Sequence, residues 1–460
     1  MDVQIQLPEK VRYIIETIQT AGYEAYAVGG CIRDSILGKE PDDWDITTSA
    51  APEEVKKMFR RTIDTGIQHG TVTVMMEKES FEVTTYRIDG KYEDSRHPKD
   101  VTFTAELKED LRRRDFTINA MAYNDQNGLI DIFEGIRDIE RKLIRCVGNA
   151  EERFTEDALR MVRAVRFSAQ LGYTIEEETK KAIKKLAPKL QNISAERIQT
   201  ELVKLLVSEH PDDIRTAYET GITKQILPEF NICMETQQNN PHHCYSVGEH
   251  ILHTLIFVES DKVLRLGMLF HDIGKPQTLK IDEKGITHNH GHAAVGEEMT
   301  IEILKRLKFD NDTLDKVRKL VRYHDWKIEP DPRNVRRAAN KIGEDIFPML
   351  FAVKYADVMA QSDYQREEKL QELKTLQEIY KEILEKKECL CLKDLAVSGN
   401  DLIAEGMKPG KEIGITLQKL LEDVLENPEH NQKEYLLSLL QLKDYPTKKT
   451  YLSILSHKIG

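Results

Sequence analysis

A glycine pair followed closely by two aspartates restricts how residues 26–46 can fold. The apolar run at 26–28 predicts a strand, and Gly29 and Gly30 permit a tight turn from that strand into a helix. Backbone N–H groups at such a turn, together with the positive end of the helix dipole, bind anions. Arg33 lies one turn further on, where its guanidinium can hold phosphate oxygens. The segment therefore predicts a phosphate-binding site.

The two aspartates predict a cation site next to it. Asp43 and Asp45 are expected on a second strand, where alternate residues face the same side and lie about 7 Å apart. Two carboxylates on one side favour a hard cation, and Mg²⁺ bound to a triphosphate is the usual one. Taken alone, a Gly-Gly turn or a pair of surface aspartates is common in proteins. The full set within seventeen residues favours a nucleotide site instead.

These residues resemble the head-domain motif of the class II tRNA nucleotidyltransferases and bacterial poly(A) polymerases, members of the polymerase-beta-like nucleotidyltransferase superfamily. The resemblance continues in the same order over about residues 24–206. It includes two further head strands, a head–neck junction, a nucleotide-selecting motif and a helix-capping motif, at residues 69–74, 81–87, 110–119, 156–160 and 196–204. The implied fold class is α+β, with a polymerase-beta-like nucleotidyltransferase head on a helical neck or body.

The resemblance also implies roles for single residues. Arg114 matches a triphosphate contact, and Asn119 matches a contact to the sugar or base. Arg163 and Arg166 match arginines that help to hold the nucleotide or the primer. Superfamily members usually recruit a third carboxylate from a neighbouring strand, and Glu82 is the candidate here. An exposed strand glutamate without a catalytic role is the alternative for Glu82.

Asp157 and Arg160 are expected side by side on one helix face, because they are three residues apart. Cytosine and adenine both present an amino donor beside a ring-nitrogen acceptor, which suit a carboxylate and a guanidinium. Uracil and guanine present a carbonyl and an N–H there, and such a buried mismatch costs about 1–3 kcal/mol. The pair would select CTP and ATP without a template. An ordinary surface ion pair, which contributes little, is the alternative.

The charge of the chain confines any RNA-binding surface to a limited region. The formal net charge of −12 argues against a protein that coats nucleic acid indiscriminately. Basic residues nevertheless concentrate at 112–204, where they favour capture of a phosphate backbone, although a solvated helix face explains part of the run at 180–189. The sequence has no apolar run that could span a bilayer and no signal-peptide pattern, so a cytoplasmic protein with six reduced cysteines is expected.

A second set of metal-binding side chains follows at residues 242–365. The adjacent His271 and Asp272, with histidines and a carboxylate on other expected helices, can bind a divalent metal. The pattern resembles the HD metal-dependent phosphohydrolases. The implied ligands of one ion are His250, His271, Asp272 and Asp357, with His292 and His324 added in binuclear versions and His253 as an alternative to His250. The implied metal is a divalent transition metal or Mg²⁺, and the implied substrates are cyclic or terminal phosphates of RNA ends.

The predicted domains are a nucleotidyltransferase head at 1–145, a helical neck or body at 146–235, an all-α HD domain at 240–365, and a helical tail at 366–460 that is expected to bind tRNA. Residues 89–100 are polar and contain Gly and Pro. They are expected to form a flexible loop, a candidate lid beside the head site.

The resemblance implies an enzyme that builds or repairs the 3′-terminal CCA of tRNA from CTP and ATP with Mg²⁺ and releases pyrophosphate, with no DNA or membrane as partner. Enzymes that add only CC or only A, and poly(A) polymerases, share these motifs and remain possible. The HD domain favours work on tRNA 3′ ends. Two further functions also compete: an HD phosphodiesterase whose head only grips RNA, and a non-catalytic tRNA-binding chaperone. The aspartate pair and Arg160 count against the phosphodiesterase.

Overall fold

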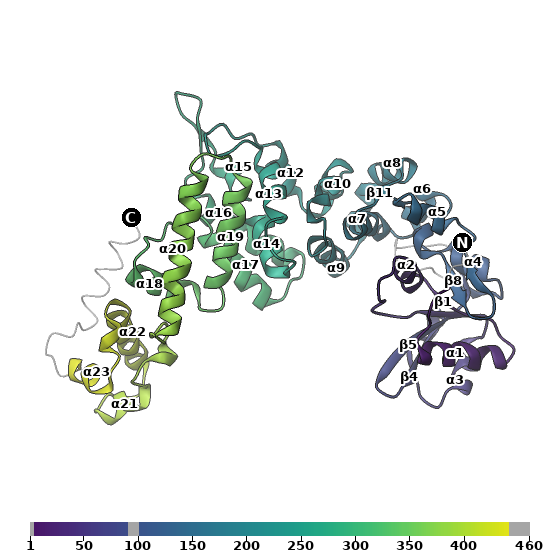
Figure 1. Cartoon of the computed structure of the whole chain (residues 1–460), viewed down its shortest axis with the longest axis horizontal. Helices are drawn as coiled ribbons and strands as arrows, with labels where there is room; N and C mark the ends of the chain where they lie inside the picture. The colour runs from purple at the N-terminus through teal and green to yellow at the C-terminus, as the bar shows by residue number, and fades with distance from the viewer. Residues whose placement is uncertain (1–3, 91–100, 441–460) are drawn as a thin grey trace.

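The computed structural model describes residues 4–90 and 101–440. An α/β head lies at one end of an elongated molecule, and helices follow one another from it to the opposite end (Figure 1). This arrangement confirms the predicted α+β class. The segment predicted to form a lid, residues 89–100, lies outside the described residues except for its first two.

The head is built on a mixed seven-stranded sheet with the order β3-β4-β5-β2-β1-β8-β9. β2 and β5 run parallel, and Ile46 pairs with Val83 in their register. The residues that precede these two, Asp45 and Glu82, are therefore level with each other in neighbouring segments. The strands are β1 (Ala25–Val28), β2 (Ile46–Thr48), β3 (Thr62–Gly66), β4 (Thr71–Met76), β5 (Glu79–Thr85), β8 (Ala122–Asn124) and β9 (Gly128–Ile130).

Short helices complete the head. α1 (Glu9–Thr20) buries Val11, Ile14, Ile15 and Ile18, which is the spacing of a single helix face. The remaining elements are α2 (Gly30–Ile36), α3 (Pro52–Met58), η1 (Ile67–His69), β6 (Arg87–Asp89), β7 (Val101–Phe103), α4 (Leu107–Arg112), η2 (Thr117–Asn119) and α5 (Gly135–Glu140). α2 begins directly at the glycine pair, so the start of this helix is presented beside the end of β1.

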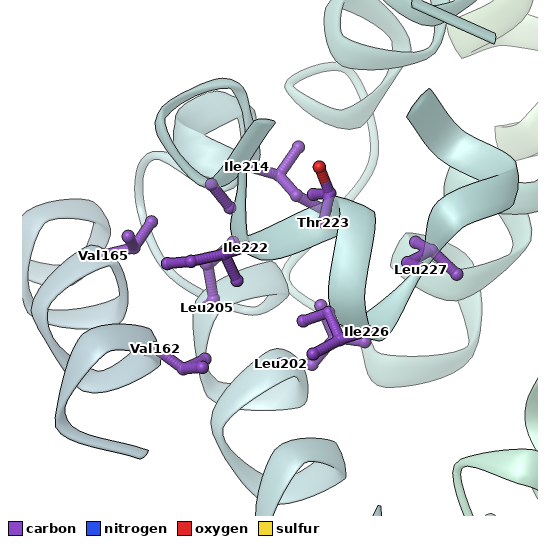
Figure 2. A pocket seen from close by; sticks show the side chains of 10 residues that line it. Val162, Val165, Leu202, Leu205, Ile214, Ile222, Thr223, Ile226 and Leu227 are labelled. Atoms are coloured by element: carbon purple, nitrogen blue, oxygen red, sulfur yellow. The ribbon is translucent and has the colours of Figure 1, made fainter. Parts of the chain in front are cut away.

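The neck, residues 143–235, is organised around two helices, α7 (Leu159–Leu171) and α9 (Ala195–Leu206). Val162 and Val165 of α7 face Leu202 and Leu205 of α9 around a small apolar cavity of about 10 Å³ (Figure 2). The other elements are β10 (Leu143–Ile144), α6 (Ala150–Glu156), β11 (Thr174–Ile175), α8 (Glu177–Leu186), η3 (Ala187–Asn192), η4 (Pro211–Asp213), α10 (Ile214–Glu219), α11 (Ile222–Ile226) and α12 (Pro228–Glu235). The apolar contact holds α9 firmly against α7.

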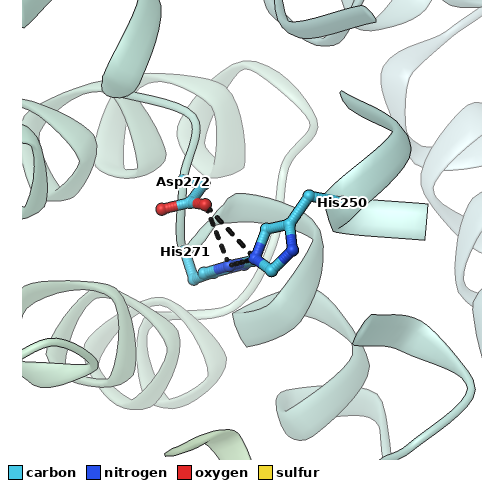
Figure 3. A group of neighbouring side chains, drawn as sticks. All are labelled: His250, His271 and Asp272. Atoms are coloured by element: carbon cyan, nitrogen blue, oxygen red, sulfur yellow. Dashed lines mark hydrogen bonds and ion pairs between the residues drawn. The ribbon is translucent and has the colours of Figure 1, made fainter. Parts of the chain in front are cut away.

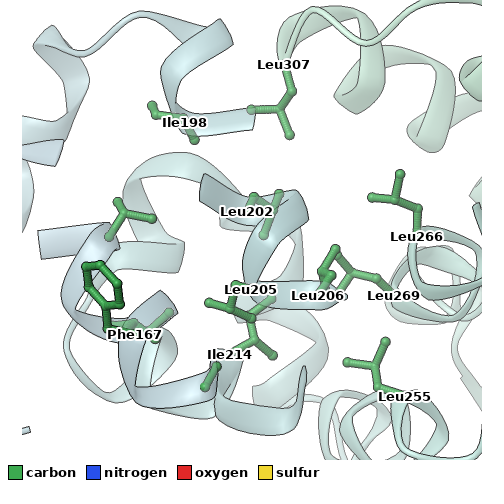
Figure 4. Packing of buried hydrophobic residues seen from close by; sticks show 14 of the residues in the cluster. Phe167, Ile198, Leu202, Leu205, Leu206, Ile214, Leu255, Leu266, Leu269 and Leu307 are labelled. Carbon is green, nitrogen blue, oxygen red and sulfur yellow. The ribbon is translucent and has the colours of Figure 1, made fainter. Parts of the chain in front are cut away.

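One apolar core continues from the head and neck into the following helices. Leu206 of α9 lies beside Leu269, with Leu255 and Leu266 close by (Figure 4). These helices are α13 (Val247–Leu255), α14 (Lys262–Phe270), α15 (Lys275–Thr278), α16 (His292–Arg306), α17 (Asn311–Tyr323), α18 (Pro332–Ile342), α19 (Phe347–Ala360) and α20 (Arg366–Glu385), with the small hairpin β12 (Lys280–Ile281) and β13 (Thr287–His288). The neck and this helix group therefore pack as one body.

The last part of the chain has a separate, smaller core. The sequence predicts a tail from residue 366, but α20 buries Leu373 and Tyr380 in the main core, and the separate cluster begins at Cys389. Arg336 of α18 attaches it by donating to the backbone carbonyl oxygens of Leu425 at 2.8 Å and Glu426 at 3.1 Å. Its elements are η5 (Leu392–Asp394), α21 (Gly399–Ala404), α22 (Lys411–Glu426), η6 (Pro428–His430) and α23 (Lys433–Leu439). Within residues 4–90 and 101–440, the helices are too short or too polar to cross a membrane.

Candidate active site and metal centre

The glycine turn brings together the side chains expected to bind phosphate. Gly29 has φ 92°, a left-handed conformation, and a Cβ at this position would lie 3.0 Å from Nη1 of Arg114. Arg33 donates from Nη1 to Oδ1 of Asn119 at 2.7 Å. Gly29, Gly30, Arg33, Arg114 and Asn119 thus form one group, although they are up to 90 residues apart in the sequence. The absence of a side chain at Gly29 leaves the space that the guanidinium of Arg114 occupies.

The carboxylates lie beside this turn, but not as the sequence predicts. Asp43 and Asp45 were expected within a strand, whereas β2 begins only at Ile46, so both aspartates lie in the segment that leads into it. The register of β2 and β5 sets Asp45 level with Glu82. In the described part of the chain, the oxygens of Asp43, Asp45 and Glu82 do not all come within 4.8 Å of one another.

The three carboxylates nevertheless act on one another electrostatically. Asp45 is exposed as a whole residue, yet loss of water around its carboxylate raises its pKa; Arg114 opposes this shift and Asp43 adds to it. The pKa of Glu82 is also raised, first by partial burial and then by the charges of Asp45 and Asp43. Oxygen ligands that repel one another suit a hard divalent cation, because the cation removes the repulsion. These residues therefore fit a site for a hard divalent cation.

The chain is not helical between α6 and α7, and this contradicts the geometry predicted for the base-selecting pair Asp157 and Arg160. Asp157 has φ −139° and ψ 103°, and α7 starts only at Leu159. The prediction that Asp157 and Arg160 share one helix face is therefore wrong. Asp157 accepts instead from Nη2 of Arg197 at 2.7 Å. Arg160 donates to Glu156 at 2.8 Å and to the backbone oxygen of Arg113 at 2.9 Å.

The two further arginines of α7 are each held by a buried acid. Arg163 donates through Nε and Nη2 to Oδ2 of Asp115, at 2.8 and 2.6 Å, and Arg166 donates through Nε to Glu201 at 2.8 Å. Burial alone would raise the pKa of Asp115, but the charge and hydrogen bonds of Arg163 lower it well below the usual range. The guanidinium groups of Arg33, Arg163 and Arg166 lie 5.1, 5.5 and 3.6 Å from the ring centre of Phe167. Phe167 is thus a common support for all three cations.

Sequence reasoning missed the acids and the arginine that fix these groups. Asp115 follows the arginine run at 112–114, and Arg197 and Glu201 lie inside the helix-capping motif. The partners are 48, 40 and 35 residues apart. No local pattern specifies such pairings. The charged residues within these motifs were the only indication in the sequence that such partners exist, because a charge that becomes buried requires a partner of opposite charge.

A second site lies where α13, the end of α14 and α19 meet. His250, His271 and Asp272 converge there (Figure 3), with Asp272 Oδ2 at 3.5 Å from His250 Nε2 and 3.3 Å from His271 Nε2. Asp357 Oδ1 lies 2.9 Å from His250 Nε2. Nδ1 of His271 lies 2.7 Å from the backbone oxygen of Met268, so Nδ1 is the protonated nitrogen and Nε2 presents its lone pair to the centre.

Asp272 also belongs to a second group of ligands. Its other oxygen, Oδ1, lies 3.4 Å from His292 Nε2 and 3.6 Å from His324 Nε2. Nδ1 of His292 and of His324 lie 2.8 and 2.7 Å from the backbone oxygens of Asn289 and Val321. The same tautomer argument therefore applies to both rings. Each oxygen of Asp272 faces one group, as in a bridging carboxylate.

The structure also decides between His250 and His253, the two candidates for one ligand position that the sequence left open. His253 stacks on Tyr245 with ring centres 4.2 Å apart, so it is turned away from the ligand group, whereas His250 lies within it. Lys275, part of the Gly-Lys that follows the His-Asp pair and supports the HD resemblance, places Nζ 2.7 Å from Asp272 Oδ2. Burial alone would raise the pKa of Asp272, but His271 and then Lys275 lower it well below its usual range. Ionised carboxylates and neutral imidazoles form a donor set that fits a divalent metal.

Three family models match parts of the chain: the Poly A polymerase head domain at residues 25–145, a probable RNA and SrmB-binding site of polymerase A at 172–234, and a putative tRNA nucleotidyltransferase domain 2 at 292–440. These three models leave residues 235–291 uncovered, and His250, His271 and Asp272 lie there.

Whole proteins are also similar. The CCA-adding enzyme of Leuconostoc mesenteroides is 38% identical over 431 residues, which are 90% of this chain and 92% of that enzyme. The CCA-adding enzyme of Lactiplantibacillus plantarum is 55% identical over 236 residues, but that alignment covers only 51% of this chain and 57% of the relative. The crystal structure of the Bacillus stearothermophilus CCA-adding enzyme in complex with CTP superposes with a TM-score of 0.70 at 29% identity, over 95% of this chain and 98% of that one.

Proposed function

This chain belongs to the family of bacterial CCA-adding enzymes, and from that premise we propose that it adds C, C and A in order to the 3′ end of tRNA, using CTP and ATP. The observation that supports this most directly is the group formed by the glycine turn, Arg114 and the carboxylates at 45 and 82. One face of the group offers donors to a triphosphate and the other offers oxygens to a cation. Because tRNA is its substrate, the proposed activity belongs in the cytoplasm.

Different residues bind the triphosphate and the base of the nucleotide. Arg33, Arg114 and the backbone N–H of Gly30 hold the triphosphate, whereas the N–H of Gly29 donates to the backbone oxygen of Met121 at 3.2 Å. Asp43, Asp45 and Glu82 would hold Mg²⁺, which supplies charge neutralisation for the phosphates and a lower pKa for the attacking 3′-hydroxyl.

Asp157 and Arg160 act on the base. The carboxylate accepts from the exocyclic amino group, and the guanidinium donates to the ring nitrogen. Because the protein supplies both partners, cytosine and adenine are distinguished from uracil and guanine without a nucleic-acid template.

The test uses three tRNA transcripts that end before CCA, at C and at CC. Each is incubated with Mg²⁺ and CTP alone, ATP alone or both. Addition of two C and one A that then stops is expected. Addition of only C, or of only A to the CC end, would identify a specialised enzyme, and continued A tailing would identify a poly(A) polymerase. No addition at all would contradict the proposal.

We also propose a second activity, metal-dependent phosphohydrolysis at the centre around Asp272. The supporting observation is that six predicted ligands from separate helices converge, with imidazole nitrogens directed inward by backbone carbonyls. A divalent metal held there supplies Lewis-acid activation of a phosphate ester. The proposed substrates are 2′,3′-cyclic or terminal phosphates of RNA, whose removal leaves an end that the head can extend.

The two activities are separated by paired variants. D272N is expected to abolish hydrolysis of 2′,3′-cyclic AMP and to leave CCA addition intact, and D43A is expected to do the reverse. The metal content of each purified protein is measured in parallel. A D272N variant that retains both its metal and its hydrolysis would contradict the second activity.

A further inference from the structure

One of the six proposed metal ligands around Asp272 is more exposed than the others. The side chain of Asp357 is 19% exposed, against 10% for His292 and at most 2% for the other four ligands. A phosphate ester that enters the centre therefore approaches from the side of Asp357. The side chains that surround Asp357 on this side determine which phosphate esters fit.

Lys369 of α20 is connected to Asp357 through one side-chain amide. Nζ of Lys369 donates to Oε1 of Gln361 at 2.6 Å, and Nε2 of Gln361 donates to Oδ1 of Asp357 at 3.1 Å. Nζ also donates to Nδ1 of His242 at 3.1 Å. An ammonium group has three N–H bonds. Within residues 4–90 and 101–440 these two acceptors take two of them, so the third remains to donate to an anion.

A second positive charge lies close to Lys369. Lys327 is exposed in the loop that follows α17. Partial burial, and then the charges of Lys369 and Lys327, lower the pKa of His242. Partial burial also lowers the pKa of Lys369; Asp357 opposes this shift, and Lys327 adds to it. The two ammonium groups therefore repel each other beside the metal centre, and an anion bound by both would remove that repulsion.

We propose that Lys369 and Lys327 form a subsite for the 5′-phosphate of the terminal nucleotide, so that the centre accepts the end of an RNA chain in preference to a free nucleoside cyclic phosphate. This inference rests on the second activity proposed above. In an RNA chain the 2′,3′-cyclic phosphate and the 5′-phosphate flank the same ribose. One nucleotide can therefore place the first at the metal ligands and the second at the lysines, whereas a free nucleoside cyclic phosphate has no second phosphate.

The same side of the centre offers an aromatic surface to a base. Tyr364 is 49% exposed, and its ring packs edge-on against His242 with ring centres 4.9 Å apart. Bases stack on aromatic side chains with little preference for sequence. A subsite built from lysines and a tyrosine therefore suits RNA ends of differing sequence.

The experiment compares two substrates that differ by one phosphate, adenosine 2′,3′-cyclic phosphate and its 5′-phosphorylated form. The ratio of their kcat/KM values is measured with Mn²⁺ in the unaltered protein, K369Q, K327Q and K374Q. Lys374 is an exposed residue of the same helix that pairs with Glu378 at 3.9 Å, so K374Q is the matched control. The unaltered protein and K374Q are expected to favour the 5′-phosphorylated substrate about tenfold, as one charge-assisted hydrogen bond does. K369Q and K327Q are expected to lose most of this preference.

Binding is measured in parallel on metal-free protein, by calorimetry with adenosine 3′-phosphate and adenosine 3′,5′-bisphosphate. The bisphosphate is expected to bind about tenfold more tightly to the unaltered protein and to K374Q, and to lose this advantage in K369Q. This comparison does not depend on hydrolysis, and neither ratio depends on the fraction of protein that is folded.

Two results would overturn this inference alone. One is equal use of the two substrates by the unaltered protein, and the other is an unchanged ratio in both K369Q and K327Q, which would leave the lysines a structural role only. Absence of hydrolysis by the unaltered protein would overturn the second activity. A preference for the bisphosphate that K369Q removes would then still support the subsite, and equal binding of the two ligands would overturn it.

Discussion

Asp45 and Glu82 lie level with each other on neighbouring parallel segments, because Ile46 of β2 pairs with Val83 of β5. Parallel neighbours are uncommon in this otherwise antiparallel sheet, and this one pairing brings carboxylates 37 residues apart to the same place. The proposed role of Glu82 as a third carboxylate therefore depends on strand register, and a shift of β5 by one residue would turn Glu82 to the opposite face.

Replacement of Glu82 by Gln is the direct test of that relationship. E82Q keeps the size of the side chain but removes the charge, and we expect kcat for CTP addition to fall about 100-fold, as for loss of one preorganised charged group in an active site. A shift of the Mg²⁺ dependence to higher concentrations should accompany it. E79Q is the control, since Glu79 begins the same strand but pairs with Lys10 on the surface. Equal activity of E82Q and E79Q would exclude Glu82 from the site.

Removal of the Asp45 charge should stabilise the fold while it abolishes activity. A carboxyl group whose pKa is raised in the folded state binds its proton more tightly there than in the unfolded chain. Its ionisation therefore costs stability as the pH rises through that folded pKa. We expect the Tm of D45N to exceed that of the unaltered protein at neutral pH without Mg²⁺.

The gap in Tm should close in acid, where both proteins carry a neutral group, and should narrow when Mg²⁺ is added. D42N, a change at an exposed neighbour, is the control. Thermal melts of the three proteins from about pH 4, near the ordinary carboxyl pKa, to neutral pH check this. A difference in Tm between D45N and the unaltered protein that is the same at every pH would contradict the prediction.

A methyl group at Gly29 should displace Arg114. Gly29 and Gly22 both have positive φ, 92° and 90°, so alanine is strained at both, and the ψ of −132° at Gly29 adds to the strain there. At Gly29 the new Cβ meets Arg114 at 3.0 Å, whereas at Gly22 it meets nothing within 4 Å. We expect G29A to raise the KM for CTP about tenfold, through loss of charge-assisted phosphate contacts, and G22A to leave it unchanged. The backbone strain can differ between the two positions, so the Tm of each variant is measured beside its KM, and equal KM values in folded proteins would remove Arg114 from phosphate binding.

The buried pair of Asp115 and Arg163 should matter far more to stability than a surface pair of the same chemistry. The side chains of Asp115 and Arg163 are 8% and 33% exposed, against 47% and 37% for Glu219 and Lys180. D115N removes the nearer of the two counter-charges of Arg163, since Glu201 lies 3.7 Å away, and is expected to cost about 3 kcal/mol. E219Q is expected to cost at most about 1 kcal/mol.

The pH dependence has a definite sign. The pKa of Asp115 is lowered in the folded state, so its contribution is complete above the ordinary carboxyl pKa and is lost as the pH falls towards the folded value. The difference between D115N and the unaltered protein should therefore shrink in acid. Urea unfolding at several pH values, together with hydrogen exchange of the amides in α7, measures both effects. A D115N cost no larger than that of E219Q would contradict the prediction.

The shared position of Asp272 predicts two metal ions per chain. Each of its oxygens faces a separate pair of histidine nitrogens. H292A should therefore reduce the bound metal from two ions to one, and D272N should remove nearly all of it. H253A, which changes a histidine outside the group, should keep two ions. Elemental analysis after dialysis against Mn²⁺ or Zn²⁺ gives the stoichiometry, and H292A with an unchanged count would show that the second group binds no ion.

Features that neighbouring residues determine could be predicted from the sequence. Features that depend on contacts between residues far apart in the sequence could not. The glycine turn and the helix after it are specified within a few residues, and the motif containing His271 and Asp272 carries its own spacing. The strand predicted for Asp43 and Asp45 was wrong, because β2 begins only at Ile46. The α+β class follows from such local patterns. The break at Asp157 was not foreseen, because helical spacing continues through it in the sequence. The break is stabilised by hydrogen bonds that the Asp157 carboxylate accepts from the backbone N–H of Leu159 and from Arg197. The bond from Arg197 depends on the packing of α9 against α7.

The separate core of the tail has a consequence for how chains of this kind can diverge. Residues 389–440 pack largely among themselves, apart from Leu390, which lies in the main core. Arg336 of α18 donates to the main-chain carbonyls of Leu425 and Glu426, acceptors that any amino acid provides, and Arg333 and Arg337 pair with the side chain of Glu426. A substitution inside that unit need not be answered by one in the head or at the metal ligands. The interior of this unit can therefore change in sequence at its own evolutionary rate, whereas Glu426 and the arginines of α18 that pair with it are expected to change together.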